Sequence, residues 1–528
     1  MNPSCLKQTL IPGTSRIFAD YLYNFDRVSG YYDWSPFCQG SFSRAAAQIE
    51  YPIERRRALV EALRDQNCDT PNLKLLSDSK TVAVVTGQQV GLFSGPAYTV
   101  FKAITAARLA QQLTEEGIPA VPIFWVSTED HDLAEVDHAW VFDAEYTPAK
   151  LTASVKPTTG PAGKVVLESA PLDQLAKSLE GFPYRDGVLD MVRRAYQPGV
   201  TLGSAFLRLL RELVAPLGLI FVDPLDSKFR EIAAPFLVDA IRKAPQIMDA
   251  VRERNAELER TGYHAQVFVD AETSPVFLLD QEQRVGLKLK GGQFAAKQTT
   301  YSVEQLTSRA LDISPSALLR PVMQDFALPT VAYVGGPAEI AYMAQCQVVY
   351  RRLLGRMPVI VPRNGFTLLD DHTTKLLNRY KLQVTDVLSH PNELRRCIAT
   401  RLVPAAVGES LSQAQAHIAA ELSRVEGVLS GFDPSLMAAL NKSGAKIRYQ
   451  LEKIIRKTET EAFRRDQQAV RAANRLSNAL FPHEHLQERV YTILPFVAQH
   501  GPELIPRLFR AAQLACPDHM VRSVSDLD

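Results

Sequence analysis

An apolar strand, a glycine-rich turn that ends in Gly-Pro, a helix and a second apolar strand follow one another twice along this chain. The first copy places its strands at 81–86 and 121–127, and the second places them at 330–334 and 357–361. Short, continuous apolar runs are typical of strands buried on both faces, and parallel pairing of such strands requires a crossover helix. The two copies therefore predict an α/β fold with a doubly wound parallel sheet, in which ligands bind beyond the carboxyl ends of the strands.

The residues between the two copies carry one more strand of the core type and one hairpin pattern. Residues 218–223 form a short apolar run behind a predicted helix, and 274–280 and 284–290 bracket a polar turn, as antiparallel strands do. We therefore predict a core domain at 1–400, with an insertion at about 143–310 that covers the ligand site.

From residue 410 onward the apolar positions recur with helical spacing. One stripe runs through 411–429, stops at the turn 431–434 and resumes through 436–480. The second helix would then contain about 45 residues and be roughly 70 Å long. A helix of that length needs a partner, so we predict a helical coiled-coil arm at 401–482 that dimerises or docks on the core. The last segment, 483–528, is predicted to pack on the core.

The composition of the chain indicates which binding partners and which cellular compartment to expect. The chain has 528 residues, with 59 Lys and Arg against 58 Asp and Glu, so its net charge of +1 creates no field toward nucleic acid or an anionic membrane. The six cysteines are far apart and form no Cys-x-x-Cys pair, which argues against a disulfide scaffold and a zinc knuckle. No apolar run approaches the roughly 18 residues of a membrane helix, and the first residues do not resemble a secretory leader. The sequence predicts a cytoplasmic protein that binds neither nucleic acid nor a membrane.

The first Gly-Pro turn combines glycines that permit close approach with the start of a helix. Its glycines allow backbone N–H groups to approach a ligand, Ser94 is placed to cap the helix that Pro96 begins, and such helix starts favour anions. The spacing matches neither the dinucleotide-binding motif nor the Walker motif, so an ordinary tight turn is the alternative. The candidate binding residues here are Gly87, Gln88, Gln89, Gly91, Ser94, Gly95 and Lys102.

The turn after the second strand is rich in acids and histidines. The four residues Glu129, Asp130, His131 and Asp132 are followed closely by three more acidic or imidazole side chains. Such a cluster at a strand end can bind a divalent metal, hold a substrate ammonium or act as general acid and base. Acids at a helix start also occur for dipole reasons alone, and the spacing matches no standard zinc signature, so we assign no residue as a metal ligand.

The second Gly-Pro turn adds residues suited to anions. Arg320 and Arg363 are placed to grip a dicarboxylate or a phosphate by bidentate hydrogen bonds, although either arginine can equally serve a structural salt bridge. The candidates from this region are Arg320, Gly335, Gly336, Glu339, Tyr342 and Arg363.

Five segments of the sequence together resemble a known family. They are TGQQVGLFSGPAYTVFK at 86–102, FWVSTEDHD at 124–132, LRPVMQD at 319–325, AYVGGPAEIAY at 332–342, and FP with LQER between 481 and 489. In this order they resemble the cysteine-adding enzymes of bacillithiol biosynthesis, over about residues 80–500. The resemblance implies a Rossmann-like core with insertions similar to the connecting peptides of class I aminoacyl-tRNA synthetases. It also implies a coiled-coil domain that supports a homodimer.

The resemblance further implies a ligase that joins the carboxyl group of cysteine to the amino group of glucosaminyl malate, which gives bacillithiol. Because a free carboxylate needs activation, ATP with Mg²⁺ is the candidate cofactor. Lys102, Arg320, Arg363 and the glycine turns would bind anionic groups, while Glu339 and the acidic turn 129–132 would act in catalysis. The class I signatures His-x-Gly-His and Lys-Met-Ser-Lys-Ser do not occur in this sequence.

Two alternatives from other classes stay open at this point. One is a class I-like adenylyl or nucleotidyl transferase that acts on another small molecule. The other is a non-catalytic scaffold in which the coiled-coil arm is the working part. Buried charge at strand ends is costly without a ligand, which argues against the scaffold.

Overall fold

The computed structural model describes residues 4–67, 69–130, 132–156, 160–280, 283–296 and 299–527. The chain divides into two compact units, one of Met1–Leu368 with Gln487–Asp528 and the other of Leu369–Leu486. In the described residues, no helix combines the length and the apolar character needed to span a membrane.

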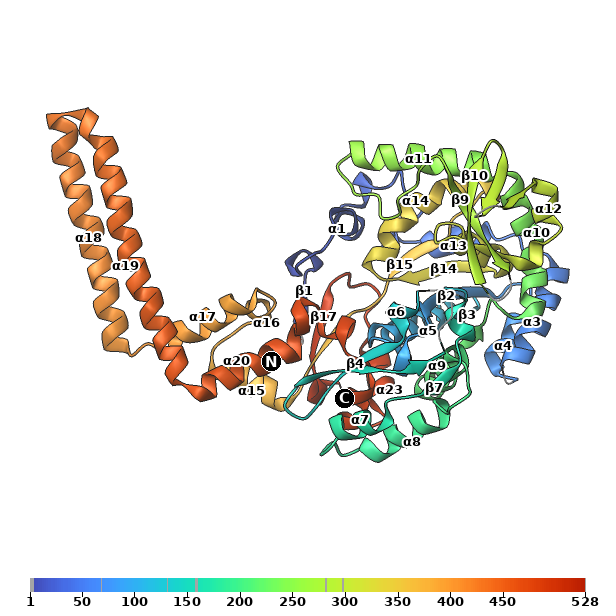
Figure 1. Cartoon of the computed structure of the whole chain (residues 1–528), viewed down its shortest axis with the longest axis horizontal. Helices are drawn as coiled ribbons and strands as arrows, with labels where there is room; N and C mark the ends of the chain where they lie inside the picture. The colour runs from blue at the N-terminus through green and yellow to red at the C-terminus, as the bar shows by residue number, and fades with distance from the viewer. Residues whose placement is uncertain are drawn as a thin grey trace. The chain divides into compact units, whose positions relative to one another are not determined.

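The first unit is built on a parallel sheet (Figure 1), to which the described residues contribute five strands. These are β2 (Val82–Gln89), β3 (Ala120–Ser127), β8 (Ile220–Val222), β14 (Thr330–Gly335) and β15 (Val359–Pro362). Across the sheet the order is β15-β14-β2-β3-β8. Read from β8 and counted along the chain, the strand order is 3-2-1-4-5. The predicted doubly wound sheet is confirmed, and the apolar run at 218–223 supplies β8. The topological switch point lies between β2 and β14.

Helices cover both faces of this sheet, which is why its strands are apolar throughout. The crossover helices are α5 (Tyr98–Glu115), between β2 and β3, and α14 (Pro337–Leu353), between β14 and β15. Val84 belongs to a core that includes Leu109 of α5, whereas the next residue, Val85, belongs to the larger core that includes Ile340 of α14. Alternate side chains of one strand therefore enter two different cores, as expected of a parallel sheet buried on both sides.

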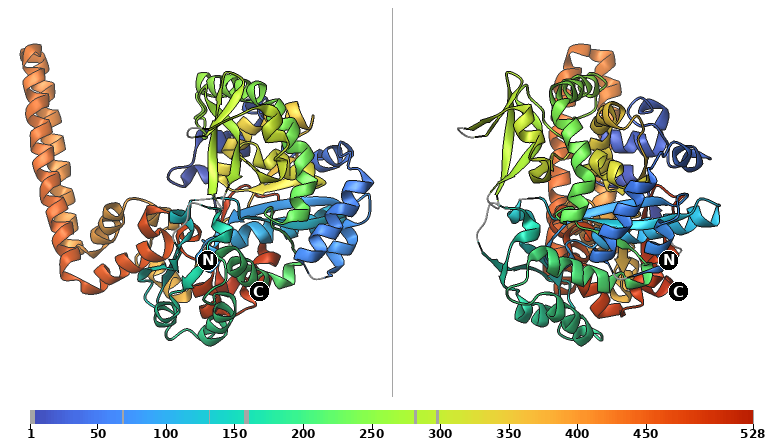
Figure 2. Two further views of the ribbon diagram at one scale, coloured as in Figure 1. Left: turned by 45° about the vertical axis from the view of Figure 1, so that its right-hand side comes forward. Right: turned by 90° about the vertical axis from the view of Figure 1, so that its right-hand side faces the viewer.

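A second, antiparallel sheet stands beside the first and is seen as yellow-green strands in Figure 2. Its strands in the described residues are β9 (Thr273–Asp280), β10 (Gln283–Lys290), β11 (Gln293–Ala296), β12 (Thr299–Tyr301) and β13 (Ile313–Pro315). The predicted hairpin at 274–290 is confirmed, because β9 pairs antiparallel with β10. This sheet and β8 both come from the long segment between the two βαβ copies.

The two ends of the chain meet in a small sheet of the first unit. Its order is β1 (Ser4–Leu6), β17 (His519–Ser523) and β16 (Phe366–Leu369), with β1 antiparallel to β17. Just before these last residues, the one-turn helix α21 (Gln487–Val490) also belongs to this unit. The C-terminal segment therefore contributes to the same unit as the central sheet.

The second unit is helical in the residues described. Its helices are α15 (Asp371–Arg379), α16 (Val384–Val387), α17 (Pro391–Leu402), α18 (Ala405–Phe432), α19 (Met437–Arg465) and α20 (Gln467–Leu480). Helices α18 and α19 lie side by side as a long hairpin (Figure 1). The prediction of one uninterrupted helix to residue 480 is wrong. At Asp466 the backbone is extended (φ −95°, ψ 91°), and the side chain of Asp466 accepts a 3.0 Å hydrogen bond from the N–H of Ala469, so it caps a new helix.

Candidate functional site

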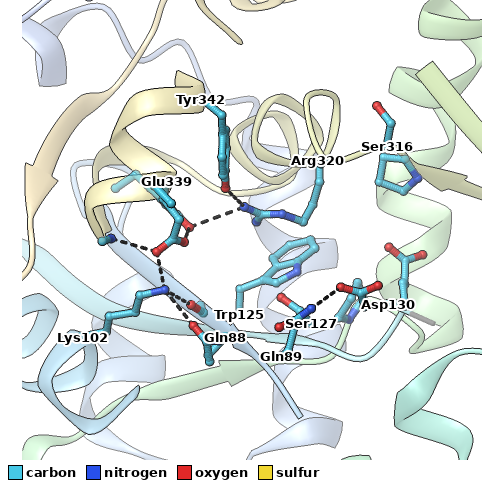
Figure 3. Close-up of a pocket in the computed structure, with 18 of the residues that line it drawn as sticks. Gln88, Gln89, Lys102, Trp125, Ser127, Asp130, Ser316, Arg320, Glu339 and Tyr342 are labelled. Atoms are coloured by element: carbon cyan, nitrogen blue, oxygen red, sulfur yellow. Dashed lines mark hydrogen bonds and ion pairs between the residues drawn. The ribbon is translucent and has the colours of Figure 1, made fainter. Parts of the chain in front are cut away.

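A cavity of about 450 Å³ lies at the carboxyl ends of β2 and β14, at the switch point of the sheet (Figure 3). We refer to it as the switch-point cavity. Of the residues predicted from the sequence, those that line it are Gly87, Gln88, Gln89, Lys102, Glu129, Asp130, Arg320, Gly336, Glu339, Tyr342 and Arg363. Those that do not line it are Gly91, Ser94, Gly95, Asp132 and Gly335. His131 lies outside the described residues.

A buried ion pair between Lys102 and Glu339 forms one wall of the cavity (Figure 3). Lys102 comes from α5, is 2% exposed, and donates to the carbonyl oxygen of Gly87 at 3.0 Å and to Oε1 of Gln88 at 2.8 Å. Glu339 comes from the first turn of α14 and accepts hydrogen bonds from the hydroxyl of Tyr333 at 2.5 Å and the N–H of Gly336 at 2.8 Å. The pair thus ties the two halves of the sheet together at the switch point.

Both side chains of the pair are largely shielded from solvent, with Lys102 at 3% and Glu339 at 20% exposure. Burial lowers the pKa of Lys102 below its ordinary value, against the opposing effect of the Glu339 carboxylate. Burial acts to raise the pKa of Glu339, but Lys102 and the hydrogen bonds from Tyr333 and Gly336 outweigh it, so this pKa lies below its ordinary value. Glu339 is therefore an anion at neutral pH, and its charge is used to hold Lys102.

Among the described residues, Arg320 makes no recorded ion pair, in contrast to Lys102 and Arg363. Its guanidinium donates to the hydroxyl of Tyr342 at 3.2 Å, the hydroxyl of Tyr333 at 3.5 Å and Oε1 of Gln324 at 3.1 Å. These hydrogen-bond partners are uncharged, and the nearby Glu339 carboxylate acts on Arg320 without a recorded hydrogen bond to it, so the guanidinium can still bind an anionic ligand. Binding of an anion by Arg320 stays a prediction.

Arg363 has a buried carboxylate partner from the C-terminal segment. Its guanidinium donates to Oε1 of Glu488 at 2.6 Å, while Oε2 of Glu488 accepts from the N–H of Phe366 at 3.0 Å. His519 lies beside this pair and shares a 2.8 Å hydrogen bond with the hydroxyl of Thr367. Burial acts to raise the pKa of Glu488, but Arg363 and His519 outweigh it and lower that pKa. Arg363 therefore lines the cavity with its charge already matched.

The acidic turn after β3 separates its carboxylates into three environments. Glu129 is buried and ion-paired with Arg230 at 2.8 Å, and burial raises its pKa against the effects of Arg230 and Arg284. Asp130 lines the cavity and accepts a 2.6 Å hydrogen bond from Nε2 of Gln89 (Figure 3). Asp132 is exposed at the start of the short helix α6 (Leu133–Val136). Only the first two are positioned to face a ligand in the cavity.

The glycine turn after β2 serves packing as much as binding. A Cβ at Gly87 would lie 2.7 Å from the carbonyl oxygen of Trp125, and one at Gly91 would lie 3.0 Å from Cα of Gly95. The predicted Ser94 cap is wrong, because α5 begins at Tyr98 and no side chain caps it. The backbone reverses earlier, where Phe93 and Ser94 adopt φ of 55° and 71° and the N–H of Phe93 donates to the hydroxyl of Tyr196 at 2.8 Å.

Several lining residues were not among the predicted ones. They are Tyr98, Trp125, Ser127, Pro224, Phe277, Arg284, Pro315, Ser316, Ala317, Tyr333, Pro337, Ala338 and Arg489. Arg284 is the clearest case. It reaches the cavity from β10, lies 4.0 Å from the centre of the Phe277 ring and has its Nη1 3.9 Å from Oδ1 of Asp130. No local motif marks Arg284, since its position depends on how the second sheet docks. Tyr333 could have been found from the sequence, because a tyrosine at the end of a buried strand needs a hydrogen-bond partner for its hydroxyl.

The described residues that line the cavity provide cations, carboxylates and hydroxyls. Within the described ranges, no three His, Cys, Asp or Glu side chains are grouped so that they could hold a metal ion. The cations are Lys102, Arg284, Arg320, Arg363 and Arg489, and the carboxylates are Glu129, Asp130 and Glu339. The arrangement suits small substrates that carry both carboxylate and amine groups.

Comparison with known proteins covers the chain almost from end to end. The family model for the N-terminal Rossmann-like domain of bacillithiol biosynthesis BshC matches residues 1–364, and the model for the C-terminal coiled-coil domain of BshC matches residues 366–523. The relatives that carry the name "Putative cysteine ligase BshC" include three with identities above 30%. The protein of Solibacter usitatus is 46% identical over 99% of this chain and 100% of its own. The protein of Koribacter versatilis is 35% identical over 99% of both, and that of Salinibacter ruber is 32% identical over 96% of both. This chain belongs to the BshC family of bacillithiol biosynthesis.

Proposed function

We propose that this protein is a ligase that joins the carboxyl group of cysteine to the amino group of glucosaminyl malate, forming the amide bond of bacillithiol. The names of its relatives, which span the whole chain, support the reaction class. The observation that carries the proposal in this chain is the switch-point cavity. It combines a buried Lys102–Glu339 pair, an arginine (Arg320) whose recorded hydrogen-bond partners are uncharged, and an acid, Asp130. These residues lie at the strand ends, where small ligands bind in doubly wound sheets.

Asp130 is the acid best placed to handle the amine. The amine must lose a proton as it attacks the acyl carbon, so a carboxylate beside it promotes the reaction. Glu129 is engaged by Arg230, and Asp132 is exposed outside the cavity lining. Asp130 faces the cavity between Gln89 and Arg284, and in this proposal it first holds the substrate ammonium and then accepts its proton.

The carboxylate of cysteine needs an energy source, which in this proposal is ATP accompanied by Mg²⁺. When bound, ATP supplies the leaving group that a free carboxylate lacks. Arg320 suits an anionic phosphate because its hydrogen-bond partners are uncharged, and Lys102 adds a second positive charge to the cavity wall. We place the reaction in the cytoplasm, since the described cysteines are free thiols, as expected in a reducing compartment.

The test is mass spectrometry of the product formed from cysteine, glucosaminyl malate and Mg-ATP, with a parallel reaction that lacks ATP. We expect the amide product only with ATP, and a loss of turnover of about 10²–10⁴-fold in Asp130→Asn, the range typical of a general base. Asp132→Asn is the matched control, because it changes an acid of the same turn outside the cavity lining, and we expect it to keep wild-type turnover. A folded wild-type enzyme that makes no amide would refute the proposal, and exchange of pyrophosphate into ATP with an unrelated acid would favour the transferase instead.

We also propose that the hairpin of α18 and α19 binds the same hairpin of a second copy. In the part of the chain that the structure describes, α18 has no buried residue and α19 has only Gly444. Large apolar side chains are exposed along the hairpin, namely Val407, Val428, Phe432, Leu436, Ile447, Tyr449 and Ile454. Exposed apolar stripes on long paired helices are typical of helical interfaces.

Light scattering of the wild type should give twice the mass of one chain. The double variant Ile447→Asp with Ile454→Asp should give the mass of a single chain. A monomeric wild type would refute the dimer.

A further inference from the structure

Arg489 is exposed within an otherwise buried stretch of the C-terminal segment. Every residue from 486 to 498 is buried except Arg489, which is exposed and lines the switch-point cavity. A long cationic side chain that emerges alone from a buried stretch is directed by its surroundings, because its neighbours leave the backbone little freedom to turn.

The residues around Arg489 are fixed from both sides. The side-chain amide of Gln487 accepts from the N–H of Leu368 at 2.8 Å and donates to the carbonyl oxygen of the same residue at 3.0 Å. Glu488 is held by Arg363 and by the N–H of Phe366. On the other side, the carbonyl oxygen of Tyr491 accepts from the N–H of Ala97 at 2.7 Å, just before α5. The base of Arg489 is therefore anchored to β16 and to the start of α5.

In the part of the chain that the structure describes, no carboxylate is bound to the guanidinium of Arg489. Within the described residues, it makes no recorded hydrogen bond or ion pair, whereas Lys102 is bound by Glu339 and Arg363 by Glu488. Arg489 lies near Tyr98, which also contacts Arg363 across its ring and accepts a 3.3 Å hydrogen bond from Gln88. An arginine that lines a cavity can bind a carboxylate through two hydrogen bonds when its backbone is held in place and its guanidinium has no recorded protein partner.

We propose that Arg489 binds a carboxylate of the malyl group of the amine substrate. This inference rests on the proposed function, in which the phosphates of ATP are assigned to Arg320 and Lys102, so the anion for Arg489 is sought among the carboxylates of the other two substrates. Cysteine has one carboxylate, which becomes the amide. Glucosaminyl malate has two carboxylates that do not react and whose charge must be matched when the substrate enters the cavity. Arg489 is thereby a specificity residue that distinguishes a dicarboxylate glucosaminide from a neutral one.

The test compares the steady-state kinetics of Arg489→Gln with those of the wild type. We expect the KM for glucosaminyl malate to rise about tenfold or more, as for the loss of a charged hydrogen bond, with the KM for cysteine unchanged. Arg489→Lys should fall between the two, because a lysine keeps the charge and loses the bidentate geometry. Arg510→Gln is the matched control, since Arg510 of α23 (Leu504–Ala511) is exposed on the same segment and does not line the cavity.

A second substrate separates recognition of the anion from a general loss of activity. With methyl glucosaminide, which carries no carboxylate, Arg489→Gln should match the wild type. An unchanged KM for glucosaminyl malate, or an equal loss with methyl glucosaminide, would overturn the proposal.

Titration calorimetry with malate alone gives a readout that does not depend on turnover. We expect the wild type to bind malate and Arg489→Gln to bind it at least about tenfold more weakly. If the wild type makes no amide but this difference in malate binding is seen, the proposed reaction fails and the carboxylate site stands. If both proteins bind malate equally, the role of Arg489 fails whatever the reaction.

Discussion

Replacing Lys102 with methionine is expected to abolish useful turnover and to destabilise the fold. Methionine has a similar length and no charge, so the change leaves the Glu339 carboxylate, whose side chain is 20% exposed, without its cation. Breaking a buried ion pair by removing one partner typically costs about 3–5 kcal/mol of unfolding free energy. The cavity wall also loses a positive charge, and we expect kcat/KM to fall by about 10²–10³-fold, as when one preorganised donor is removed.

The double variant Lys102→Met with Glu339→Gln separates stability from catalysis. With both charges removed, no unpaired carboxylate is left at position 339. The unfolding free energy should therefore recover most of its loss. Turnover should remain low, because the positive charge of Lys102 is still missing from the cavity. Denaturant unfolding and the amide assay measure the two effects independently. If Lys102→Met keeps kcat/KM within a few-fold of the wild type, the pair serves only to join the two halves of the sheet.

The fold could be predicted from the sequence wherever the signal was local. The continuous apolar runs at 81–86, 121–127, 218–223 and 330–334 are strands of the central sheet, because burial on both faces leaves no polar position to interrupt them. The break at Asp466 was missed for the opposite reason. Aspartate is tolerated within a long polar helix, and only its capping geometry shows that one helix ends there and another begins.

The site was predicted where its residues follow strand ends. Gln88, Asp130 and Glu339 come from different parts of the sequence, yet parallel strands bring their carboxyl ends to one edge, so these residues line one cavity. Arg284 and Arg489 were not predicted. Their approach to the cavity depends on how the second sheet and the C-terminal segment pack on the core, and no pattern in the sequence encodes that packing directly. The same limit applies to the partner of Arg363, because Glu488 lies more than 120 residues away in the chain.

Replacing Gly87 with alanine is expected to disturb both the sheet and the cavity. Gly87 pairs with Trp125 across β2 and β3, and an added Cβ would lie 2.7 Å from the carbonyl oxygen of Trp125 and 2.9 Å from its Cβ. Neither atom belongs to a flexible side-chain end, so the two central strands must move apart at their carboxyl ends. Overpacking of this kind typically costs about 1–3 kcal/mol of unfolding free energy.

The displacement should reduce turnover beyond any loss caused by the lower stability of the fold. The carbonyl oxygen of Gly87 accepts the hydrogen bond of Lys102, so a shift of β2 moves the Lys102 ammonium away from its position in the cavity. A misplacement of about 1 Å in such a site can cost about 10²-fold in rate. Gly187→Ala is the matched control, because a Cβ at Gly187, within α8 (Arg185–Ala195), would meet no atom within 4 Å and alanine favours a helix. The Gly187 variant should be at least as stable as the wild type with equal turnover. If Gly87→Ala matched the wild type in both denaturant unfolding and turnover, the close approach of β2 to β3 would place no demand on glycine there.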